Sequence, residues 1–93
     1  MSSILTTAVG EDFQISLSEN PSTGFLWQAA EIPSGLEMLK RAFSRLSTSA
    51  VGGIGTRTFV FRGLSSGEYE LKFSLQRGRE AAVEHTSVRV IVE

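Results

Sequence analysis

Hydrophobic and polar residues alternate along most of this chain. The alternation recurs in five segments, residues 13–18, 25–29, 58–62, 69–75 and 87–92. Because successive side chains of a β-strand point to opposite faces, each segment is a predicted strand with one face on the core. Glycine-containing turns separate these segments, as is typical of short antiparallel strands. The pattern therefore predicts an all-β fold, either an antiparallel sandwich or a barrel.

One window, residues 36–46, permits two interpretations. Four of its apolar residues recur at helical spacing: Leu36, Leu39, Phe43 and Leu46. The same window also fits two short strands, with Met38, Ala42 and Phe43 near the core. The local pattern slightly favours a helix, whereas the strands on either side favour a strand. We predict a strand here, because the rest of the chain is all-β.

The composition is that of one globular domain, which we expect to span residues 1–93. The chain is 41% apolar and 20% charged, and its net charge is −1. A chain of this size buries about 60–65% of its unfolded surface, which is enough for one core. The charge balance gives no basis for binding nucleic acid or an anionic membrane. No apolar run approaches the roughly 18 residues of a membrane-spanning helix.

The chain contains no cysteine, which excludes disulfides, thiol catalysis and zinc–thiolate sites. The first residues lack the basic region and the long apolar region of a signal peptide. Together these observations leave the compartment open. It is cytoplasmic, or periplasmic or secreted if a signal peptide was removed.

Residues suited to catalysis or metal binding are sparse. His85 is the only histidine, and a triad with Asp12 would lack a nucleophile elbow in the local sequence. No group of His, Asp and Glu has the spacing of metal ligands. The glycines of residues 52–55 lack the Lys-Ser/Thr and the following helix of a phosphate-binding loop. We therefore expect no enzyme activity and no cofactor.

Residues 20–25, the first loop, form the most informative turn of the chain. They read Asn-Pro-Ser-Thr-Gly-Phe. Asn and Ser side chains hydrogen-bond nearby backbone, Pro restricts φ, and Gly permits a positive φ. A turn of such prescribed shape on rigid strands suits a binding surface. Trp27 follows, and we expect its ring in the core beneath the turn, with an indole N–H that needs a partner.

Two further loops follow in a definite order. The second loop, residues 51–57, is rich in glycine and precedes a strand with Phe59 and Phe61. The third loop, residues 76–81, follows the strand at 69–75. In order and spacing, the three loops resemble those of the chagasin-like inhibitors of papain-family cysteine peptidases. The loops of that family read Asn-Pro-Thr-Thr-Gly-aromatic, glycine-rich, and Arg-Pro-Trp, and the resemblance extends from about residue 10 to residue 92.

The resemblance implies an immunoglobulin-like antiparallel β-sandwich of about seven to eight strands, with the three loops together at one end. It implies a reversible, tight-binding inhibitor whose loops close the active-site cleft of a papain-family cysteine peptidase. The first loop would be the central wedge, with Thr23 and Gly24 nearest the catalytic cysteine. The implied peptidase-binding residues are Asn20, Pro21, Ser22, Thr23, Gly24, Phe25, Gly52, Gly53, Ile54, Gly55, Arg77, Gly78 and Arg79.

The third loop departs from the family pattern. Arg77 matches the family arginine, but Gly78 replaces the usual proline and Arg79 replaces the usual tryptophan. A guanidinium can stack on an aromatic ring, although it buries less apolar surface than an indole. Glycine also raises the entropic cost of ordering the loop on binding. The departure predicts weaker or narrower inhibition than the full motif gives.

A second interpretation requires only the strands. On that interpretation the chain is a non-inhibitory immunoglobulin-like interaction or adhesion module of a bacterial envelope. Unclustered loops and a free sheet edge or exposed apolar patch would favour it. On the inhibitor interpretation the partner is a papain-family peptidase, and we expect a monomer when the protein is free.

Overall fold

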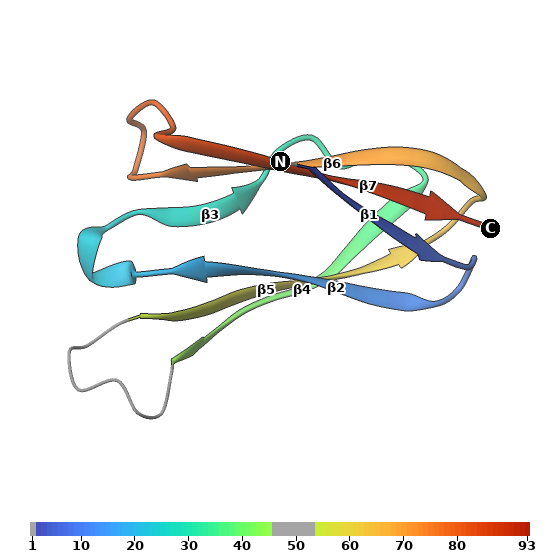
Figure 1. The fold of residues 1–93 in the computed structure, drawn as a ribbon, viewed down its shortest axis with the longest axis horizontal. Helices are drawn as coiled ribbons and strands as arrows, with labels where there is room; N and C mark the ends of the chain where they lie inside the picture. Colours follow the sequence, from blue (N-terminus) through green and yellow to red (C-terminus); the bar gives the residue numbers. More distant parts are fainter. Residues whose placement is uncertain (1, 46–53) are drawn as a thin grey trace.

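The computed structural model describes residues 2–45 and 54–93, which form two packed β-sheets (Figure 1). One sheet has four strands, in the order β1 (Ser2–Thr7), β7 (Glu84–Val92), β6 (Gly67–Gln76) and β3 (Leu26–Ala29). The other has three, in the order β2 (Asp12–Glu19), β5 (Gly55–Gly63) and β4 (Leu36–Arg45). These seven strands of the described residues confirm the predicted all-β sandwich.

The alternating pattern does not predict β1. This strand lies at the edge of its sheet and pairs in parallel with β7, whereas the other strand pairs are antiparallel. Ile4 is 68% exposed and Leu5 is half-buried. With two polar residues on either side of this apolar pair, the segment shows no alternation. Pairing with β7 therefore defines β1, because its own sequence carries little signal.

The strand β4 confirms the predicted strand and excludes the helical interpretation of this window within the described residues. It runs as one continuous strand and not as two short ones, with a register shift between Met38 and Lys40. The residue at the shift, Leu39, is 40% exposed, so the helical spacing of the apolar residues has no structural meaning. Ala42 and Phe43 are half-buried as expected, but Met38 is 39% exposed.

The inward faces of the two sheets form one apolar core. Its buried residues are Phe13, Ile15, Trp27, Leu36, Phe59, Phe61, Leu71, Phe73, Val88, Val90 and Val92. The four phenylalanines among them pack with ring centroids 5.0–6.4 Å apart. Aromatic pairs at such distances contribute about 0.5–1.5 kcal/mol each beyond their apolar burial. The period of two along the sequence therefore identifies the core face of the predicted strands.

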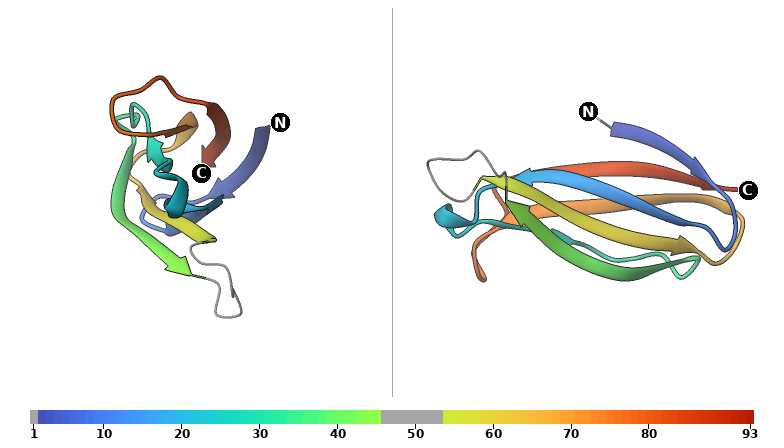
Figure 2. Two further views of the ribbon diagram at one scale, coloured as in Figure 1. Left: turned by 90° about the vertical axis from the view of Figure 1, so that its left-hand side faces the viewer. Right: turned by 90° about the horizontal axis from the view of Figure 1, so that it is seen from below.

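Strand register brings several chain reversals to one end of the sandwich, which we call the loop end. Glu19 at the end of β2 pairs with Gly55 at the start of β5, and Gly55 also pairs with Arg45 at the end of β4. The hairpin between β6 and β7, with Leu75 opposite Glu84, turns at the same end. The loop end lies on the left of Figure 1 and of the right-hand view in Figure 2.

Candidate functional site

The first loop contains a short 3₁₀ turn, η1 (Pro21–Thr23), that its own polar groups stabilise. Asn20 Oδ1 accepts hydrogen bonds from Ser22 N at 3.2 Å and from Ser22 Oγ at 2.6 Å. The Thr23 hydroxyl donates to Asn20 O at 2.8 Å and accepts from Phe25 N at 3.3 Å. Both hydroxyls therefore have partners inside the loop. The polar residues of this motif give the turn its shape before any partner binds.

A buried ion pair supports the first loop from below. The Glu19 side chain is fully buried and the Arg57 side chain is 12% exposed, with Arg57 Nη2 at 2.6 Å from Glu19 Oε2. Glu19 Oε1 also accepts a hydrogen bond from Trp27 N at 2.7 Å. Trp27 Nε1 donates to Ser18 O at 2.8 Å, which is the partner that the predicted burial of the indole requires. The two ends of the first loop are thus fixed to each other and to β5.

Neither Glu19 nor Arg57 is among the site residues predicted from the sequence, although the strand pattern carries a signal for both. Glu19 continues the inward series of β2 that includes Phe13 and Ile15, and Arg57 continues the inward series of β5 that includes Phe59. A charged side chain at an inward position requires a buried partner of opposite charge. Two such positions on neighbouring strands would have predicted this pair.

A tight turn at Arg77–Glu80 shapes the third loop. Glu80 N donates to Arg77 O at 3.0 Å, and Gly78 adopts a φ of +57°. Arg77 Nε lies 2.6 Å from Glu80 Oε2, and Arg77 Nη2 lies 3.3 Å from Glu80 Oε1. The hydrogen bond to Arg77, followed by its charge, lowers the pKa of the Glu80 carboxyl. The same hydrogen bond, followed by the negative charge of Glu80, raises the pKa of Arg77.

Arg77 also joins the third loop to the first. Its guanidinium carbon lies 4.9 Å from the centroid of the Phe25 ring. Gly24 has a φ of +84°, and a Cβ atom added there would lie 2.9 Å from Arg77 Cδ. The alkyl part of Arg77 therefore lies where a side chain at position 24 would begin. The first and third loops are in contact at the loop end.

Only part of the second loop lies within the described residues, and Gly52 and Gly53 lie outside them. Ile54 is 46% exposed at the loop end. Gly55 begins β5, where an added Cβ atom would overlap Ser44 O and lie 2.9 Å from Arg45 Cα. Gly55 therefore allows the close approach of another backbone.

Comparison with known families identifies the group to which this architecture belongs. The model of the chagasin family peptidase inhibitor I42 matches residues 6–92. The chain belongs to the chagasin family of peptidase inhibitors. This membership confirms the resemblance to the family and the expectation that the protein is not an enzyme. Comparison with curated proteins found none that matches the chain.

Three solved structures share the fold of this chagasin-family chain. The crystal structure of the cysteine protease inhibitor EhICP2 from Entamoeba histolytica matches with a TM-score of 0.78 and 19% identity, covering 99% of this chain and 96% of that one. The solution structure of amebosin matches with a TM-score of 0.73 and 22% identity, and the match covers 97% of this chain and 88% of amebosin. PbICP-C, solved in complex with falcipain-2, matches with a TM-score of 0.69 and 18% identity, and the match covers 100% of this chain and 90% of PbICP-C. The likeness confirms the immunoglobulin-like sandwich.

The altered third loop of this chagasin-family protein has a definite shape. Proline holds φ near −65°, so it cannot replace Gly78 without a change in the turn. Arg79 follows at the exposed tip, and no ion pair or side-chain hydrogen bond joins it to the described residues. Val83, just before β7, is 62% exposed at the same end and is not among the residues that the sequence predicts for the site.

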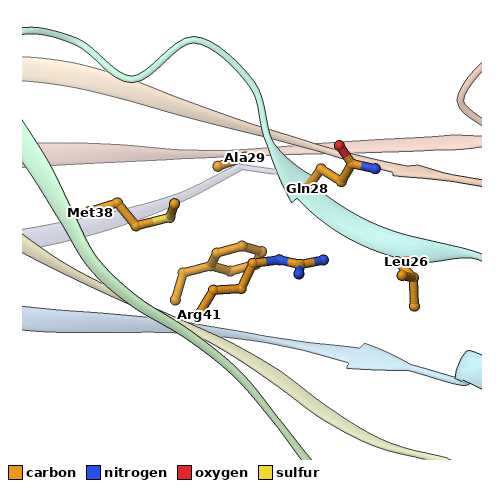
Figure 3. A pocket seen from close by; sticks show the side chains of 6 residues that line it. Leu26, Gln28, Ala29, Met38 and Arg41 are labelled. Atoms are coloured by element: carbon orange, nitrogen blue, oxygen red, sulfur yellow. The ribbon is translucent and has the colours of Figure 1, made fainter. Parts of the chain in front are cut away.

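A groove lies between β3 and β4, with Leu26, Gln28 and Ala29 on one side and Met38 and Arg41 on the other (Figure 3). Arg41 Nη2 crosses it to donate to Trp27 O at 2.9 Å. Because Glu19 accepts a hydrogen bond from Trp27 N, both the N–H and the C=O of Trp27 are hydrogen-bonded to side chains. An occupied edge resists pairing with another strand. This arrangement argues against adhesion through the edge formed by β3.

The other candidate chemistry finds no support among the described residues. His85 lies at the loop end, whereas Asp12 begins β2 at the opposite end and pairs with Arg62 at 2.8 Å. The hypothetical triad is therefore not assembled. Residues 2–45 and 54–93 contain no group of three His, Asp or Glu residues that could hold a metal ion. No helix in this part of the chain is long and apolar enough to cross a membrane.

Proposed function

We propose that this protein is a reversible, tight-binding inhibitor of papain-family cysteine peptidases that occludes the active-site cleft with its three loops. The inhibitor is a single domain spanning residues 1–93 and is monomeric when free. The observation that carries the proposal is the contact between the first and third loops at one end of a chagasin-family chain. EhICP2 is a cysteine protease inhibitor and PbICP-C was solved in complex with falcipain-2, which supports the choice of target class.

The first loop enters the cleft as the central wedge. Gly24 is exposed and has no side chain, so its backbone can approach the thiolate–imidazolium pair of the peptidase closely. The second and third loops contact the two rims of the cleft. Three contact regions of this kind suit a protease–inhibitor interface of roughly 1,600 Å².

The chemistry of the loops makes the complex non-covalent. No side chain of the first or third loop is an electrophile that a thiolate could attack. Affinity must therefore come from shape and polar complementarity. The hydrogen bonds around Asn20 and the ion pair of Glu19 with Arg57 preorganise the wedge, which lowers the entropic cost of binding.

Titration of papain and of a cathepsin-L-like peptidase tests this function. We expect stoichiometric loss of activity that recovers on dilution, and protection of the catalytic cysteine from alkylation by iodoacetamide. A serine peptidase such as trypsin is the matched control and should keep full activity. Folded protein that leaves both cysteine peptidases active at about micromolar concentration would refute the proposal. Binding without protection of the cysteine would refute occlusion of the cleft.

A further inference from the structure

The two arginines of the third loop lie two residues apart in different environments. Arg77 makes paired hydrogen bonds to Glu80, lies over the ring of Phe25, and occupies the space that a side chain at position 24 would enter. Arg79 is exposed and has no hydrogen bond or ion pair with the described residues. Two side chains of the same chemistry are therefore available to a partner to very different extents.

We propose that these arginines have separate roles, with Arg77 positioning the third loop against the first and Arg79 selecting peptidases whose surface beside the cleft is acidic. This inference rests on the proposed function and names the kind of target that the inhibitor prefers. It follows from the contacts of this chain, since the usual tryptophan is absent at position 79.

The contacts of Arg77 account for the positioning role. Its guanidinium fork is directed at both oxygens of Glu80, and its planar group lies over the Phe25 ring at 4.9 Å. A guanidinium makes both contacts at once because it is planar and carries several donors. The lysine ammonium has neither the plane nor the fork. Arg77 therefore links the wedge to the third loop through its geometry more than through its charge.

The charges at the loop end support the selecting role of Arg79. This end carries four arginines and three glutamates: Arg45, Arg57, Arg77, Arg79, Glu19, Glu80 and Glu84. Ion pairs with Glu19 and Glu80 already engage Arg57 and Arg77. The whole chain carries a net charge of −1, whereas the four arginines and three glutamates give the loop end a net positive charge. The loop end is therefore the more positive pole of the molecule. Such a pole steers the inhibitor toward an acidic surface and accelerates association.

The position of Arg79 also suits recognition of a carboxylate. It follows Gly78 at the tip of the turn, where the positive φ of the glycine reverses the chain. An arginine with free donors forms two parallel hydrogen bonds with a carboxylate, which gives direction as well as attraction. Stacking of Arg79 on an aromatic residue of the target is the competing mode of contact, and charge reversal separates the two.

The positioning role is tested first in the free inhibitor. We expect Arg77→Ala to increase amide hydrogen exchange by about tenfold at Thr23 and at Glu80, whose amides donate to Asn20 O and to Arg77 O, and Arg77→Lys to restore little of the protection. Arg79→Ala is the matched control and should leave exchange in both loops unchanged. Unchanged exchange in Arg77→Ala, or full rescue by lysine, would overturn the positioning role. This measurement does not depend on any peptidase.

The selecting role is tested on two papain-family peptidases, one with an acidic and one with a basic rim to its cleft. We expect Arg79→Glu to weaken inhibition of the acidic enzyme by about tenfold, mainly through slower association, and to strengthen inhibition of the basic enzyme. This weakening of inhibition of the acidic enzyme should be smaller when salt is raised from about 50 to about 300 mM, since screening weakens exposed charge pairs. Arg79→Ala should fall between the wild type and Arg79→Glu.

The outcomes separate this inference from the proposed function. Wild-type protein that inhibits both peptidases, with equal and salt-independent losses in Arg79→Ala and Arg79→Glu, would overturn selection by charge and leave the inhibitor function intact. Wild-type protein that inhibits neither would overturn the proposed function and target selection together. Losses that follow the sign of the rim charge would support both.

Discussion

Two pairs of arginine and glutamate lie at the loop end, and they differ in burial. The pair of Arg57 and Glu19 lies below the first loop, with side chains 12% and 0% exposed. The pair of Arg77 and Glu80 lies in the third loop, with side chains 54% and 57% exposed. Both have a shortest N···O distance of 2.6 Å. Identical chemistry at identical distance therefore occurs in two very different dielectric surroundings.

The difference shows how the same pair serves either the fold or the site. We call Arg57 with Glu19 the inner pair and Arg77 with Glu80 the outer pair. A buried charge without its partner is strongly destabilising, so the stability of the fold depends on the inner pair. An exposed pair contributes little to global stability because water and salt screen it. The outer pair can therefore position one loop without affecting the core. Loss of the inner pair should appear in unfolding, and loss of the outer pair in loop order and inhibition.

The largest expected effect comes from Arg57→Ala, which leaves the Glu19 carboxylate buried without its partner. We expect the free energy of unfolding to fall by about 3–5 kcal/mol, measured by chemical denaturation. Arg62→Ala is the matched control. Arg62 pairs with Asp12 on the same two strands, with side chains 43% and 48% exposed, and its loss should leave the denaturation midpoint nearly unchanged. Equal effects of the two substitutions would contradict the distinction between buried and exposed ion pairs.

The contact between the loops is tested by two glycines with matching backbones. Gly24 and Gly10 have φ values of +84° and +86°, but only Gly24 has neighbours within reach of an added side chain, namely Arg77. We expect Gly24→Leu and Gly10→Leu to lose similar stability, about 1–2 kcal/mol, from the positive φ. Gly24→Leu alone should displace Arg77 and obstruct the wedge, with inhibition of papain weaker by at least about thirtyfold.

Equal inhibition by the Gly24→Leu and Gly10→Leu variants would contradict this prediction. If both variants inhibit papain equally, neither the space at Gly24 nor its contact with Arg77 matters for binding. If only Gly24→Leu fails to inhibit but it also unfolds, the loss reports on folding. Circular dichroism and the denaturation midpoint of both variants separate these cases.

The sequence predicts the fold well because its signal is local. Alternation identifies the core faces of β2, β5, β6 and β7, and the turn residues predict the first loop. The strand β1 escapes prediction, since its structure depends on pairing with β7, which local alternation does not report. The helical spacing in β4 misleads because a register shift places Leu39 at the surface.

The site is less predictable because its contacts join distant segments. Motif order brings Arg77 into the candidate site, but its place over Phe25 depends on where the β6–β7 hairpin turns relative to β2 and β3. The partnership of Glu19 with Arg57 spans 38 positions in the sequence. A charge at an inward strand position is a local signal that a partner exists. Which residue supplies that partner depends on register, which the tertiary structure determines.

The smallest expected effect is the pH dependence of the outer pair. The hydrogen bond and charge of Arg77 lower the pKa of Glu80 below its ordinary value of 4.5. A carboxyl with a lowered pKa in the folded state stabilises that state above its ordinary pKa. The stabilisation is lost as the pH falls through the lowered value. The pair of Arg77 and Glu80 should therefore persist in mildly acidic conditions above that value.

A nuclear magnetic resonance titration of the Phe25 ring protons from about pH 7 to about pH 2 measures this loss, because the Arg77 guanidinium lies over the ring. We expect a transition whose midpoint lies below pH 4.5. Glu80→Gln should abolish the transition, whereas Glu84→Gln, which removes a neighbouring carboxyl at the start of β7, should leave it unchanged. A midpoint at or above 4.5 would mean that Arg77 does not hold Glu80 in solution, and the outer pair would then have no positioning role.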